Sequence, residues 1–233
     1  MLKYTIVNFY HFFKVEDKDL LLYKFLYLGK KKNIKGTIII ADEGINAALA
    51  GRKDSVDEII SFFSSIINGK DFTIHFSYSN ELPFERFKVK IKPEIVSLKN
   101  GCFGGCNVNY VDHQDWDQFI ARNDVMLLDV RNNYESKYGY FKNAIKPDLN
   151  SFREFPAWIN QNKKLLDNRK EKIATYCTGG IRCEKFLVYL KKLGYNEVFQ
   201  LKGGILGYLM NNSNFLKKSW IGKCFVFDNR ILI

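Results

Sequence analysis

The chain has 233 residues, of which 46% are hydrophobic and 15% aromatic, so it can bury one large core or two small ones and is not a disordered chain. Its formal net charge of +11 at pH 7 favours a polyanionic partner such as nucleic acid, although a generally basic proteome is the alternative explanation. No apolar run approaches the roughly 18 residues of a membrane span, and the N-terminus lacks a signal-peptide layout, so we expect a cytosolic protein without a membrane partner.

The first part of the chain reads as strand, helix, strand, strand, helix, strand. Aromatic and β-branched runs predict the strands, and apolar residues at helical spacing predict the helices. The expected strands cover residues 4–13, 36–41, 45–50 and 71–78, and the expected helices cover 17–32 and 56–67. This βαββαβ order is typical of a ferredoxin-like domain, which we place at residues 1–95. Because that fold serves many functions, the topology alone identifies none of them.

A basic segment follows the last of these strands. If residues 85–92 are extended, Phe87, Val89 and Ile91 point to one face and four cations to the other. The four cations are Arg86, Lys88, Lys90 and Lys92. At spacings of about 6–7 Å they can follow a phosphate backbone, or they can belong to an edge strand whose lysines prevent aggregation. The net charge favours the first reading, so we predict that these cations contact RNA.

The second part of the chain alternates strands and helices, which predicts a parallel sheet covered on both faces. A segment rich in glycine and asparagine, residues 96–112, separates it from the first part and is expected to be a linker. The expected strands cover residues 125–130, 173–176 and 197–201, and the expected helices cover 133–138, 153–166, 181–193 and 205–210. We assign this α/β domain to residues 113–215 and treat 216–233 as a short C-terminal extension.

The five cysteines do not indicate a disulfide framework, because their number is odd and the chain is not small. Cys102 and Cys106 have the spacing of half a zinc site, but no second pair stands at ligand spacing. The three histidines are scattered along the chain and form no cluster. We therefore predict no metal site.

The most informative stretch is the loop after the strand at 173–176. Cys177 ends that strand, and Gly179 and Gly180 lead into a helix that begins at Ile181. At a helix N-terminus, unpaired backbone N–H groups and the macrodipole stabilise a thiolate and lower the pKa of the thiol. The two glycines can adopt positive φ, so their N–H groups can turn inward and hold an anion. The sequence therefore predicts a nucleophilic cysteine at the carboxyl end of a parallel strand, where open α/β sheets carry their sites.

The spacing of this loop indicates which group it holds. Arg182 follows Cys177 at C-x4-R spacing, with Thr178 in the loop, and adds fixed positive charge at the helix start. Cysteine phosphatases use C-x5-R, because a loop one residue longer encloses a tetrahedral phosphate. A shorter ring of N–H groups suits a smaller group, such as the terminal sulfur of a persulfide. We therefore favour sulfur chemistry over phosphate-ester hydrolysis.

Three further residues are candidates for supporting roles. Asp129 and Arg131 stand at the end of the strand at 125–130, where they can shape the site or pair with each other and brace the loop. Cys183, in the first turn of the next helix, can resolve an oxidised Cys177 or pack in the core, and we favour packing. The glycines of Lys202-Gly203-Gly204 are expected to permit close backbone packing near the site.

Together these residues resemble a rhodanese domain, through the Leu128–Arg131 run, residues 139–145, the Cys177 loop and residues 201–204. The nearer resemblance is to one branch of that superfamily, the oxygen-dependent tRNA uridine 5-hydroxylases. It covers nearly the whole chain and rests on the runs at 36–46, 83–90, 92–96, 152–156 and 176–185. The resemblance implies an acylphosphatase-like N-terminal domain, a rhodanese domain at 113–215 and Cys177 as the catalytic cysteine, which can carry a persulfide.

The resemblance further implies that the enzyme converts the wobble uridine of tRNA to 5-hydroxyuridine, with dioxygen as co-substrate and tRNA as partner. The sequence itself contains no flavin, haem or histidine–carboxylate iron motif, and it indicates no cofactor and no obligate protein partner. Fuller members continue beyond a Cys-Phe-Val-Phe-Asp segment into a cysteine-rich tail. Here that segment ends at Asp228 and five residues follow, so we expect no metal site supplied by a tail.

Two other functions are compatible with parts of the sequence. A plain sulfurtransferase, which passes sulfane sulfur through a Cys177 persulfide, accounts for the loop but leaves the N-terminal domain and the net charge of +11 unexplained. A non-catalytic RNA-binding module with a decayed rhodanese domain accounts for the charge. The intact loop from Cys177 to Arg182 argues against such decay.

Overall fold

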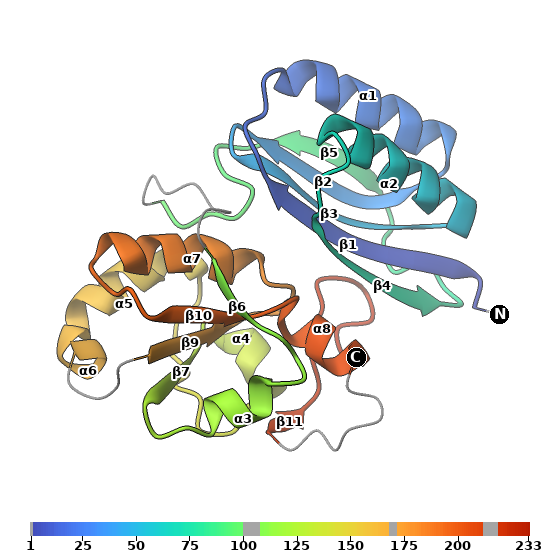
Figure 1. The fold of residues 1–233 in the computed structure, drawn as a ribbon. Coiled ribbons are helices and arrows are strands. Elements are labelled where there is room, and N and C mark those ends of the chain that lie inside the picture. The colour runs from blue at the N-terminus through green and yellow to red at the C-terminus, as the bar shows by residue number, and fades with distance from the viewer. Residues whose placement is uncertain (1, 100–107, 168–171, 212–218) are drawn as a thin grey trace. The chain divides into compact units, whose positions relative to one another are not determined.

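The computed structural model describes residues 2–99, 108–167, 172–211 and 219–233. The chain forms two compact units. The first comprises Met1–Ile95 with Asp228–Arg230, and the second comprises Val96–Phe227 with Ile231–Ile233. Figure 1 draws the elements of both units, coloured along the chain. Within the described ranges, no helix is long and apolar enough to cross a membrane.

The first unit is a five-stranded sheet with two helices on one face (Figure 1). Its elements are β1 (Tyr4–Phe12), α1 (Lys18–Lys31), β2 (Lys35–Ala41), β3 (Gly44–Gly51), α2 (Lys53–Ile66), β4 (Thr73–Ser79) and β5 (Phe87–Ile91). The strand order is β4-β1-β3-β2-β5, in which the first four strands pair antiparallel and β5 adds to β2 in parallel. The predicted ferredoxin-like order is therefore confirmed, with one extra edge strand.

Strand β5 is held at the sheet edge by its apolar residues. Phe87 and Val89 pack against the core between the sheet and the helices, while Lys88 and Lys90 are exposed. Helix α1 makes room for this strand at Gly29, because a Cβ atom there would lie 2.2 Å from the Phe87 ring. The predicted alternation of apolar residues on one face and cationic residues on the other is present, with the apolar residues half-buried and the cations exposed.

The second unit is built on a parallel sheet with the order β6-β10-β9-β7. Its strands are β6 (Asn109–Val111), β7 (Val125–Asp129), β9 (Lys172–Tyr176) and β10 (Val198–Leu201). Its helices are α3 (Trp116–Ile120), α4 (Asn133–Ser136), the 3-10 helix η1 (Phe152–Glu154), α5 (Phe155–Gln161), α6 (Lys163–Asp167), α7 (Ile181–Lys192) and α8 (Gly204–Asn211). Separate apolar cores, one with α5, α6 and α7 and one with α3 and α8, cover the two faces, as the parallel sheet predicts (Figure 1).

Three local features differ from the sequence expectation. Strand β6 lies inside the segment 96–112 that we read as a linker, and it pairs with β10. The helix expected over 153–166 is divided into η1, α5 and α6, because Pro156 fits only a first helical turn and the Asn162 side chain donates to the Trp158 carbonyl where α5 ends. A small two-stranded sheet joins β8 (Gly139–Phe141) to β11 (Trp220–Gly222), which lies in the C-terminal extension.

Candidate active site

Cys177 lies between β9 and α7, at the carboxyl end of a parallel strand as predicted. Its side chain is fully buried, and the backbone N–H of Gly180 donates to its Sγ at 3.1 Å. The backbone N–H groups of Arg182 and Cys183 also donate to this sulfur. Of the two loop glycines, both in the described part of the chain, only Gly180 has a positive φ, of 102°. The predicted turning of N–H groups toward the sulfur therefore depends on Gly180 and the start of α7, and not on Gly179.

The first residues of α8 are hydrogen-bonded to the backbone of this loop. The N–H of Ile205 donates to the Cys177 carbonyl at 3.0 Å, and the N–H of Leu206 donates to the Thr178 carbonyl at 3.0 Å. Gly204 has a φ of 62°, and a Cβ atom there would lie 2.5 Å from the Cys177 carbonyl oxygen. The close packing that we predicted from the Gly203-Gly204 pair is therefore present, and it requires glycine at 204.

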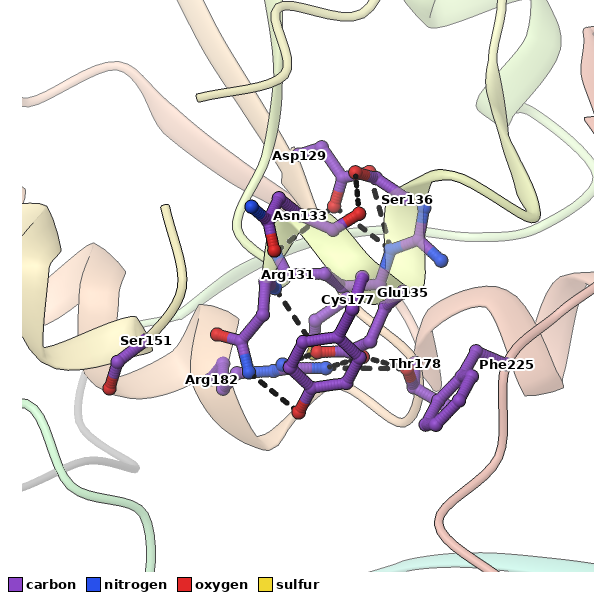
Figure 2. A network of polar contacts seen from close by, with 12 residues as sticks. Asp129, Arg131, Asn133, Glu135, Ser136, Ser151, Cys177, Thr178, Arg182 and Phe225 are labelled. Carbon is purple, nitrogen blue, oxygen red and sulfur yellow. Dashed lines mark hydrogen bonds and ion pairs between the residues drawn. The ribbon is translucent and has the colours of Figure 1, made fainter. Parts of the chain in front are cut away.

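A buried ion pair holds Arg182 beside the loop (Figure 2). Its guanidinium donates to both carboxylate oxygens of Glu135, at 2.5 and 2.7 Å, and to the Thr178 hydroxyl at 3.3 Å. The Thr178 hydroxyl in turn donates to Glu135 at 3.1 Å. Glu135 also accepts the backbone N–H of Asn132 at 3.1 Å, so the same carboxylate caps α4 and orients Arg182.

The electrostatics of the loop favour a thiolate at Cys177. Burial opposes ionisation, but the Cys183 thiol that donates to the sulfur, the charge of Arg182 and the backbone donors together hold the pKa of Cys177 below its usual value. For Cys183, burial and the neighbouring Cys177 sulfur raise the pKa well above the usual value. The pair is therefore poised as a thiolate at 177 and a thiol at 183.

The charge of Arg182 is itself balanced. Burial would raise the pKa of Glu135, but the charge and hydrogen bonds of Arg182 lower it below the usual value. Glu135 is therefore ionised at neutral pH, and the guanidinium keeps a fixed counter-charge. Because Glu135 offsets the charge of Arg182, the partial positive charges of the main-chain N–H groups also help to stabilise the sulfur anion.

Asp129 and Arg131 pair with each other, which favours the bracing alternative. Arg131 donates to Asp129 through Nε at 2.9 Å and Nη2 at 2.7 Å, and both side chains are almost completely buried. Nη2 also donates to the Gly139 carbonyl at 2.6 Å. This pair therefore connects the end of β7 to β8. Its hydrogen bonds brace the segments next to the loop and do not reach the Cys177 sulfur.

Several residues near the loop were not among the sequence candidates. Glu135 is the most important of them, and the pattern Asn132-x-x-Glu135 gave a signal only for a helix start. Its partner Arg182 lies 47 residues further along the chain, so the pairing depends on the tertiary fold. Cys224, in the C-terminal extension, is also fully buried, and burial raises the pKa of its thiol to about 12.

The other predicted residues belong to the first unit or lie outside the described residues. Arg86, Lys88, Lys90 and Lys92 are all exposed and belong to the first unit. Cys102 and Cys106 lie outside the described residues. Within residues 2–99, 108–167, 172–211 and 219–233, no group of three or more His, Cys, Asp or Glu side chains is placed to hold a metal ion.

Comparison with known proteins agrees with this two-part organisation. Residues 4–95 match the UPF0176 acylphosphatase like domain, and residues 112–211 match the rhodanese-like domain. A solved structure, the BH2092 protein from Bacillus halodurans, is 26% identical over 45% of this chain and 73% of its own, with a TM-score of 0.36.

Curated relatives match along almost the entire chain. The tRNA uridine(34) hydroxylase of Rickettsia rickettsii is 42% identical over 98% of this chain and 92% of its own length. The protein of the same name from Rickettsia typhi is 43% identical over 97% of this chain and 91% of its own. Identity at this level over nearly the whole chain shows the family, whose members are named as enzymes. The chain belongs to the tRNA uridine(34) hydroxylase family.

Proposed function

We propose that this protein hydroxylates C5 of the wobble uridine in tRNA anticodons, with dioxygen as co-substrate and Cys177 as the catalytic residue. The observation that carries the proposal is the Cys177 sulfur, held by the Gly180 N–H at 3.1 Å beside a neutralised arginine. The names of the relatives support the substrate and the reaction type. A tRNA substrate also supports the expected location in the cytosol.

The thiolate provides a chemical route to C5. A thiolate can add to C6 of uracil, which raises the electron density at C5, the carbon that the proposed reaction oxidises. One oxygen atom then enters the new C5–O bond, and the other is reduced to water. That balance consumes two electrons and two protons, for which two cellular thiols that become a disulfide are the proposed reductant. The C5–H bond and the C6–S bond then break, so that the C5 proton goes to solvent, the sulfur leaves as the Cys177 thiolate and the C5–C6 double bond is restored. The loop residues Thr178 to Arg182 position the sulfur, and Glu135 positions Arg182.

The exposed cations of the first unit are the proposed contacts to the tRNA backbone. Arg86, Lys88, Lys90 and Lys92 leave the strand on its solvent-exposed side. Each phosphate that they neutralise would release a condensed counterion, so tRNA affinity should fall steeply with added salt. An edge strand that only resists aggregation would show no such dependence.

The test is mass spectrometry of anticodon nucleosides from cells that lack the gene and carry either the wild-type protein or Cys177→Ser. The proposal expects 5-hydroxyuridine-derived nucleosides to return only with the wild-type protein. The alternative is a sulfurtransferase, which is favoured by the short C-x4-R ring around Cys177. It would leave these nucleosides unchanged while thiosulfate turnover is lost in the variant. Equal rescue by Cys177→Ser would leave only a binding role.

A further inference from the structure

An exposed group of aromatic side chains stands next to the Cys177 loop. It consists of Tyr134, Tyr138, Phe225 and Phe227, which we call the aromatic cluster. The ring centroids of Tyr134 and Phe225 are 5.5 Å apart, those of Tyr138 and Phe225 are 6.0 Å apart, and those of Phe225 and Phe227 are 5.3 Å apart. Tyr134 is 40% exposed, Tyr138 46% and Phe227 57%.

The cluster is attached to the loop through both of its segments. Tyr134 precedes Glu135, whose carboxylate binds Arg182 and Thr178. The Arg182 guanidinium lies 5.8 Å from the centroid of the Phe227 ring. The rings and the loop therefore share Arg182, and a ligand that stacks on the cluster would be in reach of the loop.

The exposure of these rings does not come from a frayed segment. Cys224 and Val226 are buried and bonded through their backbone N–H groups to Ile233 and Ile231. Phe225 and Phe227 alternate with them, and Phe225 is half-buried against the neighbouring rings while Phe227 is exposed. The neighbouring Lys223 donates its backbone N–H to the Tyr138 carbonyl at 2.8 Å. An anchored segment thus presents the Phe227 ring to solvent, with Phe225 packed beside it, which costs free energy unless something binds there.

The charges around the cluster indicate the chemistry of the ligand. The exposed side chains of Lys137 and Lys223 adjoin it in sequence, whereas the Arg182 guanidinium near Phe227 is buried and paired with Glu135. Rings that can stack with bases, flanked by cations that can meet phosphates, are the features with which proteins bind single-stranded nucleic acid. Cys177 itself is fully buried, so the cluster and not the sulfur is the surface that a base meets first.

We propose that the aromatic cluster binds unpaired bases of the anticodon loop by stacking and so delivers the uridine to the Cys177 loop. This inference rests on the proposed function and adds to it the group that recognises the substrate. Stacking is tolerant of sequence, because every base has a π-face. Binding to the cluster should therefore depend more on the bases of the loop being unpaired than on which bases they are.

The experiment compares binding of an anticodon stem-loop RNA by the full chain and by Tyr134→Ala and Phe227→Ala, which each remove one exposed ring from one of the two segments. Each variant should bind about 5- to 150-fold more weakly, the factor expected for the loss of one stacked base. The salt dependence should keep its slope, because no cation is removed. Tyr134→Phe and Phe227→Trp, which keep a ring, should retain wild-type binding.

Tyr23→Ala is the matched control, because it removes a tyrosine that is 67% exposed on α1, an element of the first unit. It should bind the stem-loop as the wild type does. Wild-type affinity in both cluster variants would overturn the inference, and so would an equal loss for a fully paired RNA. If the wild type binds through the cluster but produces no 5-hydroxyuridine, the proposed function fails and the binding site stands. If it hydroxylates and the variants bind normally, only the inference fails.

Discussion

Replacing Glu135 by glutamine removes the carboxylate that neutralises the buried guanidinium of Arg182. The Glu135 side chain is 0% exposed and that of Arg182 is 8% exposed, so water cannot replace the lost charge. Glutamine keeps the shape of the side chain and one acceptor oxygen, which makes the change one of charge and not of volume. The result is an uncompensated cation inside the second unit.

The structure sets the size of this effect. Removing one partner of a buried ion pair costs about 3–5 kcal/mol, because the remaining charge stays desolvated. At the lower end of that range, the melting temperature of the second unit should fall by roughly 10 °C. The pKa of Cys177 should also fall further, since the Arg182 charge would then act on the thiolate without a counter-charge.

The assay is urea and thermal unfolding of Glu135→Gln beside the wild type, with Glu58→Gln as the control. Glu58 pairs with Lys32 at 2.5 Å, but its side chain is 49% exposed, so its loss should cost at most about 1 kcal/mol. If Glu135→Gln is no less stable than Glu58→Gln, the ion pair between Glu135 and Arg182 does not stabilise the loop.

Three further predictions concern the loop and the basic strand. Thiolate absorbance, measured as a function of pH with Cys177→Ser as the reference, should show that the Cys177 sulfur stays ionised until the pH falls well below about 8.5. A titration midpoint at or above that value would contradict the lowered pKa of Cys177. In urea unfolding, Gly204→Ala should lose more stability than Gly194→Ala. Both glycines have positive φ, but of the two only a Cβ atom at 204 would meet a backbone oxygen, at 2.5 Å. Equal losses of stability would refute the close packing at Gly204. Lys88→Ala with Lys90→Ala should reduce the salt slope of tRNA binding by about 2, whereas an unchanged slope would remove these lysines from the interface.

Much of the fold follows from local sequence patterns. Helix α2 carries Val56, Ile59 and Phe63 on one buried face, and α7 begins at Ile181 as its preceding glycines predict. The short strands β6, β8 and β11 were not predicted, because three residues carry no periodicity of their own. They are strands only because a partner strand lies beside them.

The candidate site likewise contains residues that local sequence predicts and residues that only the tertiary fold brings together. Cys177, Gly180 and Arg182 lie within six consecutive residues, so their geometry follows from one strand–loop–helix junction. Glu135 could not be assigned to the site from sequence, because its role depends on how β7 and β9 pair in the sheet. Phe227 likewise read as part of a short extension, and only its distance to the Arg182 guanidinium connects it to the loop.

The reaction of purified protein with tRNA under heavy-isotope dioxygen tests the central proposal most directly, with a thiol reductant present and nucleosides analysed by mass spectrometry. We expect 5-hydroxyuridine that carries the heavy oxygen with the wild-type protein, and none with Cys177→Ser or under nitrogen. Unlabelled 5-hydroxyuridine, or the same yield from Cys177→Ser, would contradict it.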